Sequence, residues 1–399
     1  MVTKASLYLL TLILVLSGGI SSLFAQQMGI TPVKIAQELP SLTVNRKFQD
    51  HEGYIWFATA NGLSRFDAFN LLTFKLADEN GSTVTNQNIL AINEIDRNIL
   101  LGTESGVFIL DQRTYRITRF PDEQLKDRRV AAIMVDKQSK IWFGADNGIY
   151  VYSKDLRLHD KFEHGSDTEK SIPLGTVNTI FQDRDGEIWT GIWAAGLHKL
   201  DTKTNTFKAF PAIGQSNSPF KIAQDDRGQY WVSTWGDGLF LFNPDDPENM
   251  FQEIIIKNKR RGVGKEGLVY NIVQDHIKKY IWVLSFSGIS TYRYTKDGDI
   301  EEVDLSNLFQ HTSNFFQDIY ADRSGNLWLA INGEGVSTIS FDRPTMRNFS
   351  LPQIQQRYHI SPNINMLYRD REDQLWFNLE RIGLGKYTPQ KDELETYSN

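Results

Sequence analysis

Eight stretches of the chain repeat one arrangement of apolar and polar positions. In each, an alternating segment such as NTIFQD leads through a turn into an apolar segment such as EIWTGI. After a short loop, a glycine opens a third segment such as GLHKLD. Apolar residues at every second position are typical of β-strands with one face in a core. No segment shows a helical period of comparable strength, so the pattern predicts an all-β protein.

The tryptophan of the second segment marks the length of the repeat. Successive copies of this position, with Leu100 in place of tryptophan in the second unit, lie 42 to 51 residues apart. That spacing matches a propeller blade of about 40 to 50 residues. We therefore predict a β-propeller of four-stranded antiparallel blades, in which each tryptophan packs between blades and buries on the order of 200 Å². The tryptophans are Trp56, Trp142, Trp189, Trp231, Trp282, Trp328 and Trp376.

The first segment of each unit ends at an acidic residue, and in four units a glycine follows three residues later. An aspartate that opens a tight turn and a glycine that ends it are typical turn chemistry, so these acids are predicted to form turns rather than bind metal. In the sixth unit Asp275 comes one residue early, and we expect a different turn there. The other acids, six residues before the tryptophan position, are Asp50, Glu94, Asp136, Asp183, Asp225, Asp322 and Asp370.

Eight units allow two ways of closing a ring. The favoured prediction is a seven-bladed propeller over residues 26–350, with the eighth unit, 351–399, as the start of a truncated second propeller. The alternative is one ring of eight blades, with a strand near Val33 to Ala36 pairing into the last blade. The pattern leaves open whether the chain is complete or a fragment of a longer protein.

Residues 1–25 have the features of a secretory signal peptide. Lys4 supplies a positive charge, residues 7–16 an apolar stretch, and Ala25 a plausible cleavage position. The alternative is a retained membrane anchor, because the apolar stretch through Ile20 is nearly long enough to span a bilayer. The small residues before Ala25 favour cleavage, so we expect export to the periplasm.

Composition narrows the classes of partner. The chain has 43 Lys and Arg against 49 Asp and Glu, a net charge of −6, and its one short basic run lies at Lys257–Lys265. This balance argues against nucleic acid as a partner. The chain has no cysteine, which excludes disulfides, thiolate metal sites and a cysteine nucleophile.

No arrangement of residues predicts catalysis. The seven histidines have no recurring metal-ligand spacing, and neither a G-x-S-x-G elbow nor a phosphate-binding loop occurs. We therefore expect no catalytic residues, no metal and no cofactor, and interpret the chain as a non-enzymatic protein.

A propeller has one face on which ligand binding is expected. The loops after the tryptophan segments and the connections between blades meet at the same end of the blades, and loops on a rigid scaffold commonly carry function. Trp193 and Trp235 are the residues there whose rings can stack on a sugar. The candidate residues of this face are Asn61, Glu104, Asp146, Trp193, Trp235, Asp237, Phe286, Glu334 and Arg381, with Asn147, Glu380, Arg128, Arg129 and Asn314 beside them.

The repeat, with D-x-x-G, an apolar-tryptophan pair and then G-L with a short aromatic strand, resembles the two-component-regulator propeller repeat over about residues 28 to 399. Such repeats belong mostly to the periplasmic sensor region of hybrid two-component histidine kinases from glycan-degrading bacteria. The resemblance implies a sensor module that recognises a carbohydrate fragment, with a second propeller, membrane-proximal domains and a kinase in the full-length relative. A homodimer is a further partner that it leaves open.

This chain departs from the family layout, because it contains no membrane helix, kinase or receiver segment after the repeats. Signal output would therefore reside elsewhere. Two alternatives stay open beside the sensor: a propeller that docks another protein without a small ligand, and a propeller glycosidase or lyase.

Overall fold

The computed structural model describes residues 29–77, 81–165, 170–256, 267–309 and 315–340, and, near the C-terminus, 364–370, 372, 374–379, 383–388 and 393–398. The chain divides into two compact units, residues 1–342 and 343–399. The predicted signal segment lies outside the described residues.

The first unit contains seven four-stranded antiparallel sheets, each with an inner, a second, a third and an outer strand. The inner strands are β2 (Val44–Gln49), β6 (Ile89–Ile95), β10 (Val130–Val135), β14 (Val177–Gln182), β18 (Pro219–Gln224), β22 (Val269–Gln274) and β26 (Phe316–Ala321). The second strands, which carry the tryptophan position, with Leu100 there in β7, are β3 (Ile55–Thr59), β7 (Asn98–Thr103), β11 (Ile141–Ala145), β15 (Ile188–Ile192), β19 (Tyr230–Thr234), β23 (Ile281–Ser285) and β27 (Leu327–Ile331).

The third and outer strands complete the blades. The third strands are β4 (Gly62–Phe66), β8 (Gly106–Asp111), β12 (Gly148–Tyr152), β16 (Gly196–Asp201), β20 (Leu239–Phe242), β24 (Gly288–Tyr294) and β28 (Gly335–Ser340). The outer strands are β5 (Leu71–Phe74), β9 (Arg116–Arg119), β13 (Leu158–Glu163), β17 (Thr206–Ala209), β21 (Phe251–Ile254), β25 (Ile300–Val303) and β1 (Gly29–Pro32). Three short 3-10 helices, Lys34–Glu38, Glu123–Leu125 and Ser306–Phe309, lie between strands.

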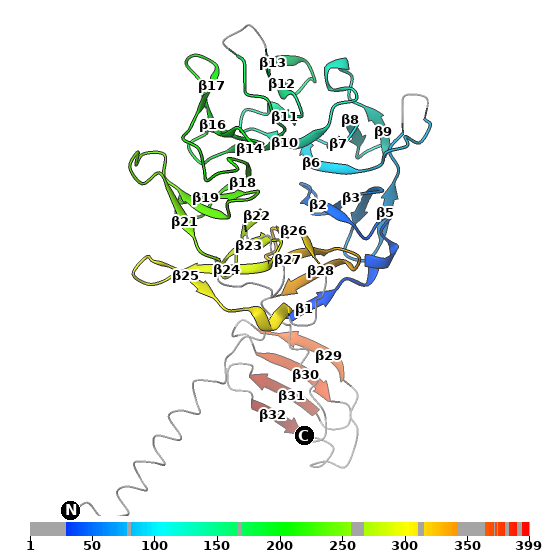
Figure 1. Cartoon of the computed structure of the whole chain (residues 1–399). Coiled ribbons are helices and arrows are strands. Elements are labelled where there is room, and N and C mark those ends of the chain that lie inside the picture. Colours follow the sequence, from blue (N-terminus) through cyan, green and yellow to red (C-terminus); the bar gives the residue numbers. More distant parts are fainter. Residues whose placement is uncertain are drawn as a thin grey trace, which may run out of the picture. The chain divides into compact units, whose positions relative to one another are not determined.

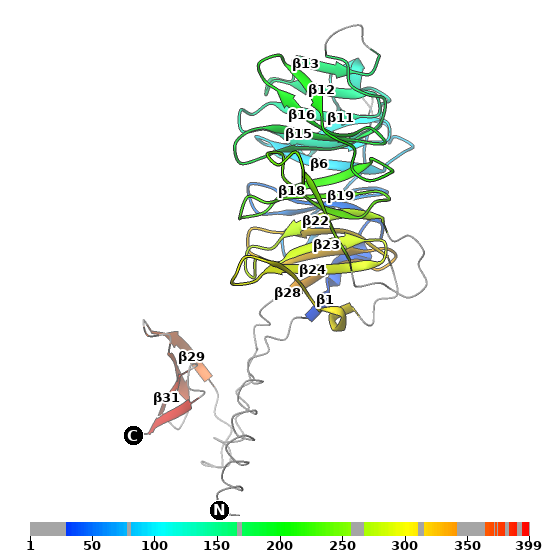
Figure 2. The same ribbon diagram turned by 60° about the vertical axis from the view of Figure 1, so that its left-hand side comes forward.

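The seven sheets form a closed ring. Each inner strand is next to the inner strands of the two neighbouring blades, and β26 of the seventh blade is next to β2 of the first (Figure 1). Figure 2 shows the same sheets after a 60° turn. The predicted all-β propeller with four-stranded antiparallel blades is confirmed, and its ring has seven blades.

The ring is closed by a strand from the other end of the unit. β1 pairs antiparallel with β28, with Gly29 opposite Ser340 and Pro32 opposite Ser337, so the outer strand of the seventh blade comes from the N-terminal side. This differs from the alternative that placed a pairing strand near Val33 to Ala36, because residues 34–38 form a 3-10 helix. Because the seventh blade takes its strands from both ends of the unit, the hydrogen bonds between β1 and β28 hold the ring closed.

One buried hydrogen bond recurs in six blades of the ring. One carboxylate oxygen of the turn aspartate accepts from backbone N–H groups of its own turn, and the other accepts from the tryptophan indole Nε1, 2.7 to 3.0 Å away. The turn and the tryptophan are therefore fixed by one side chain. The pairs are Asp50 with Trp56, Asp136 with Trp142, Asp183 with Trp189, Asp225 with Trp231, Asp275 with Trp282 and Asp322 with Trp328.

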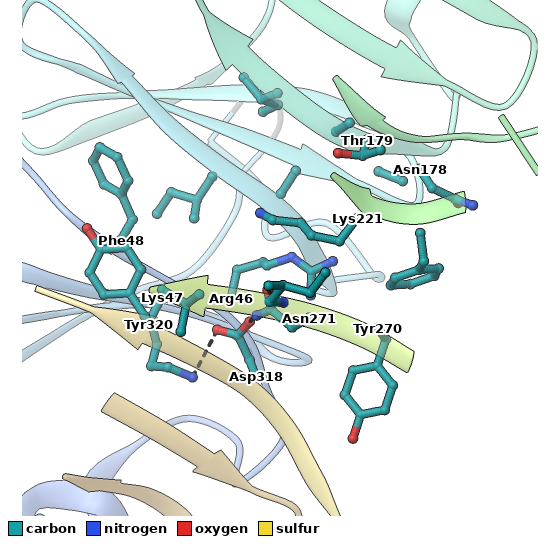
Figure 3. A pocket seen from close by; sticks show the side chains of 18 of the residues that line it. Arg46, Lys47, Phe48, Asn178, Thr179, Lys221, Tyr270, Asn271, Asp318 and Tyr320 are labelled. Carbon is teal, nitrogen blue, oxygen red and sulfur yellow. Dashed lines mark hydrogen bonds and ion pairs between the residues drawn. The ribbon is translucent and has the colours of Figure 1, made fainter. Parts of the chain in front are cut away.

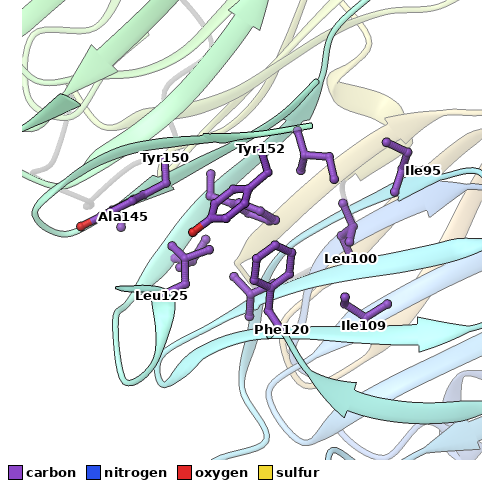
Figure 4. Packing of buried hydrophobic residues seen from close by; sticks show 12 residues of the cluster. Ile95, Leu100, Ile109, Phe120, Leu125, Ala145, Tyr150 and Tyr152 are labelled. Atoms are coloured by element: carbon purple, nitrogen blue, oxygen red, sulfur yellow. The ribbon is translucent and has the colours of Figure 1, made fainter. Parts of the chain in front are cut away.

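Each of the six tryptophans bonded to a turn aspartate in the ring is buried and packs toward the next blade. Trp328 of the seventh blade contacts Phe57 and Phe66 of the first, with ring centroids 5.9 Å apart in both pairs, so the packing continues across the point of closure. In the second blade Leu100 has this role and lies in a cluster with Phe143 and Phe120 (Figure 4).

In two blades the turn between the inner and the second strand differs from the aspartate turn of the others, and the sequence of each blade explains the difference. In the second blade β6 and β7 are joined by the two-residue turn Asp96-Arg97, and the blade has no tryptophan that needs a carboxylate. In the sixth blade Asp275 lies seven residues before Trp282, and Lys279 has the left-handed φ of 60° that the longer turn requires.

We call the end of the blades with these aspartate turns the turn face, and the opposite end the loop face. On the turn face of five blades, a polar residue at the end of the inner strand, or one residue before it, reaches the preceding blade. Its side-chain oxygen accepts from the backbone N–H that follows the turn aspartate, at 2.8 to 3.0 Å. One of these bonds, from Arg323 to Gln49, crosses the point of closure. The pairs are His51 with Glu94, Lys137 with Gln182, Arg184 with Gln224, Asp226 with Gln274 and Arg323 with Gln49.

The second unit contains an eighth sheet of the same kind. It consists of β29 (Ile364–Arg369), β30 (Leu375–Leu379), β31 (Gly383–Thr388) and β32 (Glu393–Ser398). Asp370 accepts from Trp376 Nε1 at 2.7 Å, as in the ring, but Trp376 is only partly buried and stacks on Tyr397 of its own sheet.

Candidate functional site

The loop face is held together by one recurring backbone bond. In six blades, the residue after the second strand donates its N–H to the carbonyl of the residue before the inner strand, at 2.8 to 3.0 Å. The loop inside a blade and the connection from the previous blade therefore lie side by side, as the strand order predicts. The donor residues are Ala60, Asp146, Trp193, Trp235, Phe286 and Asn332.

The inner strands are bulged where they reach the loop face. In all seven, the pairing register with the second strand shifts at the second residue of the inner strand. A β-bulge inserts an extra residue and re-aims the side chains next to it. The bulged residues are Asn45, Leu90, Ala131, Asn178, Phe220, Tyr270 and Gln317.

Aromatic side chains connect the loops of the fourth to sixth blades with these bulges. Trp193 is 39% exposed, and its ring centroid lies 6.0 Å from that of Trp235 at an interplanar angle of 50°. Trp235 in turn lies 5.4 Å from Phe220. Phe286 and Tyr270 both contact Phe315, at 5.1 and 5.4 Å. We call these six residues the aromatic arc.

Three of the predicted polar residues are engaged in holding the loops. Asn61 donates its Nδ2 to the carbonyl of Pro40 at 3.1 Å, and Glu104 pairs with Arg129 at 3.2 Å. Asp237 accepts from the backbone N–H groups of Gln215 and Ser216, both at 2.9 Å. The carboxylate of Asp237 therefore braces the connection between the fourth and fifth blades.

The remaining predicted polar residues differ in their surroundings. Asp146 and Asn147 each have a buried side-chain oxygen without a hydrogen-bond partner among the described residues. Glu334 is exposed in the turn between β27 and β28. Arg381, like Glu380 and Asn314, lies outside the described residues. The structure therefore brings Trp193, Trp235 and Phe286 into one aromatic cluster and leaves the polar candidates dispersed around it.

A cavity of about 360 Å³ lies along the axis of the ring and is lined by all seven inner strands (Figure 3). We call it the axial channel. Phe220 and Tyr270 belong both to its lining and to the aromatic arc. The residues that follow the bulges form one level of its wall: Arg46, Ala91, Ala132, Thr179, Lys221, Asn271 and Asp318.

One buried ion pair crosses the channel wall at the point of closure. Lys47 occupies the position that isoleucine has in the other six inner strands, and its Nζ lies 2.9 Å from Oδ2 of Asp318. The two side chains are 0% and 3% exposed. Burial lowers the pKa of Lys47, and the charge of Asp318 opposes that shift. Asn271 donates to the other carboxylate oxygen of Asp318 at 2.7 Å.

The channel residues were not among the residues predicted from the sequence. Arg46 and Lys221 stand at the position after the bulge, where two other blades have alanine. Aligning the repeats on their turn aspartates would have exposed these two cations as departures from the repeat. What the alignment could not provide is the direction of the side chains, because that depends on the bulge.

The described residues carry no arrangement typical of a metal centre or a membrane helix. No three His, Asp or Glu side chains among them come together in a way that could hold a metal ion. Within the same residues, no helix has the length and apolar character needed to cross a membrane.

Comparison with known structures extends the fold assignment. The structure is similar to the extracellular domain of a hybrid two component system from B. thetaiotaomicron, with a TM-score of 0.64 and 19% identity over 93% of this chain and 49% of that one. A second such domain from B. thetaiotaomicron has a TM-score of 0.61 and 20% identity over 93% and 47%. This chain thus spans about half the length of those two domains.

A similar structure of another kind is virginiamycin B lyase from Staphylococcus aureus, with a TM-score of 0.60 and 13% identity over 79% of this chain and 99% of the lyase. No protein-family model matches the sequence, and no match was found among curated protein sequences. At these identities the likeness concerns the fold, so the class established for this chain is a β-propeller protein.

Proposed function

We propose that the chain is the ligand-sensing propeller of an exported bacterial two-component signalling protein, and that it binds an oligosaccharide on the loop face. The observation that carries the proposal is the aromatic arc. Its outer member, Trp193, is exposed, and its inner members, Phe220 and Tyr270, reach the axial channel. The fold shared with extracellular domains of hybrid two component systems supports the signalling role.

Sugar rings suit this surface for a physical reason. Their C–H faces are apolar while their rims are polar, so they stack on aromatic rings that remain partly in water. Ligand sites in proteins are typically apolar concavities with a few polar groups that fix orientation. Trp193 and Trp235 provide the stacking surface at the rim, and the channel provides the concavity.

The test is binding of oligosaccharides to the purified chain, measured by thermal shift and by calorimetry. Selective binding to the folded state must raise the Tm. We expect Trp193→Ala to weaken binding at least about tenfold, as for other aromatic contact residues. Phe69→Ala is the matched control, because Phe69 is 86% exposed but lies in the β4–β5 turn on the turn face.

A library that leaves the Tm unchanged would overturn the ligand proposal, as would binding that Trp193→Ala and Phe69→Ala affect equally. Turnover of a bound sugar would instead favour a glycosidase or lyase. Export is tested separately: osmotic shock of cells that express a tagged chain should release it from the periplasm.

A protein-docking propeller is the second candidate, and one observation favours it. Leu174, on the connection that precedes β14, is 67% exposed and lies on the same face as Trp193. Exposed apolar side chains grouped on one face mark interaction sites. Loss of a protein partner in Leu174→Asp, with oligosaccharide binding absent in the unaltered chain, would favour this candidate.

A further inference from the structure

The charges in the axial channel do not balance. Its wall contains three cations, Arg46, Lys47 and Lys221, and one carboxylate, Asp318. Lys47 and Asp318 neutralise each other through the ion pair at 2.9 Å. Arg46 and Lys221 remain, one from the first blade and one from the fifth, at the same level of the wall (Figure 3).

Of Arg46 and Lys221, Lys221 has fewer hydrogen-bond partners. Arg46 donates one N–H to the carbonyl of Asn45 at 2.8 Å. Within the part of the chain that the structure describes, no hydrogen bond or ion pair joins the Lys221 ammonium to another residue. Burial lowers the pKa of Lys221 and the nearby charge of Arg46 lowers it further, while the charge of Asp318 opposes these shifts. An enclosed cation without a partner is unfavourable, and an anion beside it relieves that penalty.

The channel has space for such an anion and a route to it. Ala91 and Ala132 occupy the same level of the wall in the second and third blades, and their small side chains leave room in the cavity of about 360 Å³. Cavities of about 300 Å³ and more are typical of small-molecule sites. Phe220 and Tyr270, two members of the aromatic arc, line the channel at the bulges. A ligand that stacks on the arc can therefore extend a substituent toward Arg46 and Lys221.

We propose that the axial channel binds an anionic group, a carboxylate, sulfate or phosphate, between Arg46 and Lys221. The inference rests on the proposed function in one respect: it makes the ligand an acidic oligosaccharide, whose sugar rings stack on the arc and whose charged group enters the channel. Thr179, at the same level, supplies a neutral hydroxyl beside the anion.

The experiment compares trigalacturonate, neutral galactotriose and inorganic sulfate as probes, by calorimetry on the purified chain. Lys221→Met removes the ammonium and keeps the length of the side chain. Lys203→Met is the matched control, because Lys203 is exposed on the turn face. Sulfate also stabilises proteins without binding to a site, so only the difference between the variants counts.

We expect trigalacturonate and sulfate to bind the unaltered chain and Lys203→Met equally, and Lys221→Met at least about tenfold more weakly, the effect of losing a charge-assisted hydrogen bond. Lys221→Arg should retain binding. Lys221→Met should also raise the Tm of the anion-free protein, since it removes a partly buried cation that has no partner among the described residues.

The outcomes separate this inference from the proposed function. Binding of galactotriose that needs Trp193 but not Lys221 supports the sugar site and overturns the anion site. Binding of sulfate that needs Lys221, without binding of either sugar, supports the anion site and overturns the sugar proposal. Anion binding that is absent, or unchanged in Lys221→Met, overturns the anion site.

Discussion

The two faces of the propeller differ in how much their residues vary from blade to blade. On the turn face the same groups recur: an aspartate, the indole that it accepts from, and a strand-end side chain that reaches the preceding blade. On the loop face the residue after the second strand is different in nearly every blade, from Ala60 to Trp193 and Asn332. Every junction between blades needs the same support, so the turn face repeats. Binding needs a particular set of side chains, so the loop face varies.

The largest effect is expected for a comparison of two tryptophans that lie four residues apart, one on each side of this difference. Trp189 is buried and donates to Asp183 at 2.8 Å, while Trp193 is 39% exposed. We expect Trp189→Ala to lower the free energy of unfolding by about 4 kcal/mol, because it leaves a large cavity. Trp193→Ala should lower it by less than about 1 kcal/mol. Urea denaturation measures both, and equal losses would contradict the division into a structural and a binding face.

The second test concerns the junction that closes the ring. Asp318→Ala leaves the Lys47 ammonium buried without its partner, and should destabilise the protein by about 3 kcal/mol or more. Adding Lys47→Ile supplies the residue that the other six inner strands have, and should recover most of that loss. A double-mutant cycle gives the coupling between the two positions. Independent, additive losses would show that the ion pair does not stabilise the closure.

A smaller effect is expected for the bonds that link one blade to the next on the turn face. Gln224 accepts from the backbone N–H of Arg184 at 3.0 Å, so Gln224→Ala should reduce the free energy of unfolding by about 1 kcal/mol. Gln215 is exposed on the loop face, and Gln215→Ala should change it by less than about 0.5 kcal/mol. Denaturation midpoints compare the two, and a larger loss for Gln215→Ala would reverse the assignment of the faces.

The smallest expected effect depends on pH. A hydrogen bond to Glu94 raises the pKa of His51, and this pair joins the first two blades. A raised pKa in the folded state adds stability below the unfolded value of about 6.5, and this stability is lost as the pH rises through the folded value. His51→Gln should therefore destabilise at about pH 5.5 and have no effect at about pH 8.5.

The size of this effect is limited because His51 is half exposed, and solvent screening keeps it under about 1 kcal/mol. The Tm difference between His51→Gln and the unaltered chain, measured across that pH range, is the readout. A difference that grows with pH would contradict the role of the pair.

Much of the turn face was visible in the sequence, since its signals are local. Asp183 and Gly186 predict their turn from neighbouring residues alone. The spacing of six residues between the acid and the tryptophan position recurs in seven units, but the spacing alone did not predict the hydrogen bond from Trp189 to Asp183.

The candidate site was harder to predict, because its contacts join residues that are far apart in the chain. Asp237 was predicted to face a ligand, but its carboxylate accepts from residues 215 and 216, on the connection before its own blade. Lys221 and Arg46 lie 175 residues apart, and each looks like an ordinary exposed residue of a polar strand. Only closure of the ring brings them to one cavity.

The sequence by itself determined the repeating blade, its strands and its turns, because each depends on interactions between residues less than about 50 positions apart. The tertiary structure decided where the ring closes, which strand completes the last blade and which side chains share the axial channel. These are contacts between distant segments, and they exist only once all seven blades have packed around one axis.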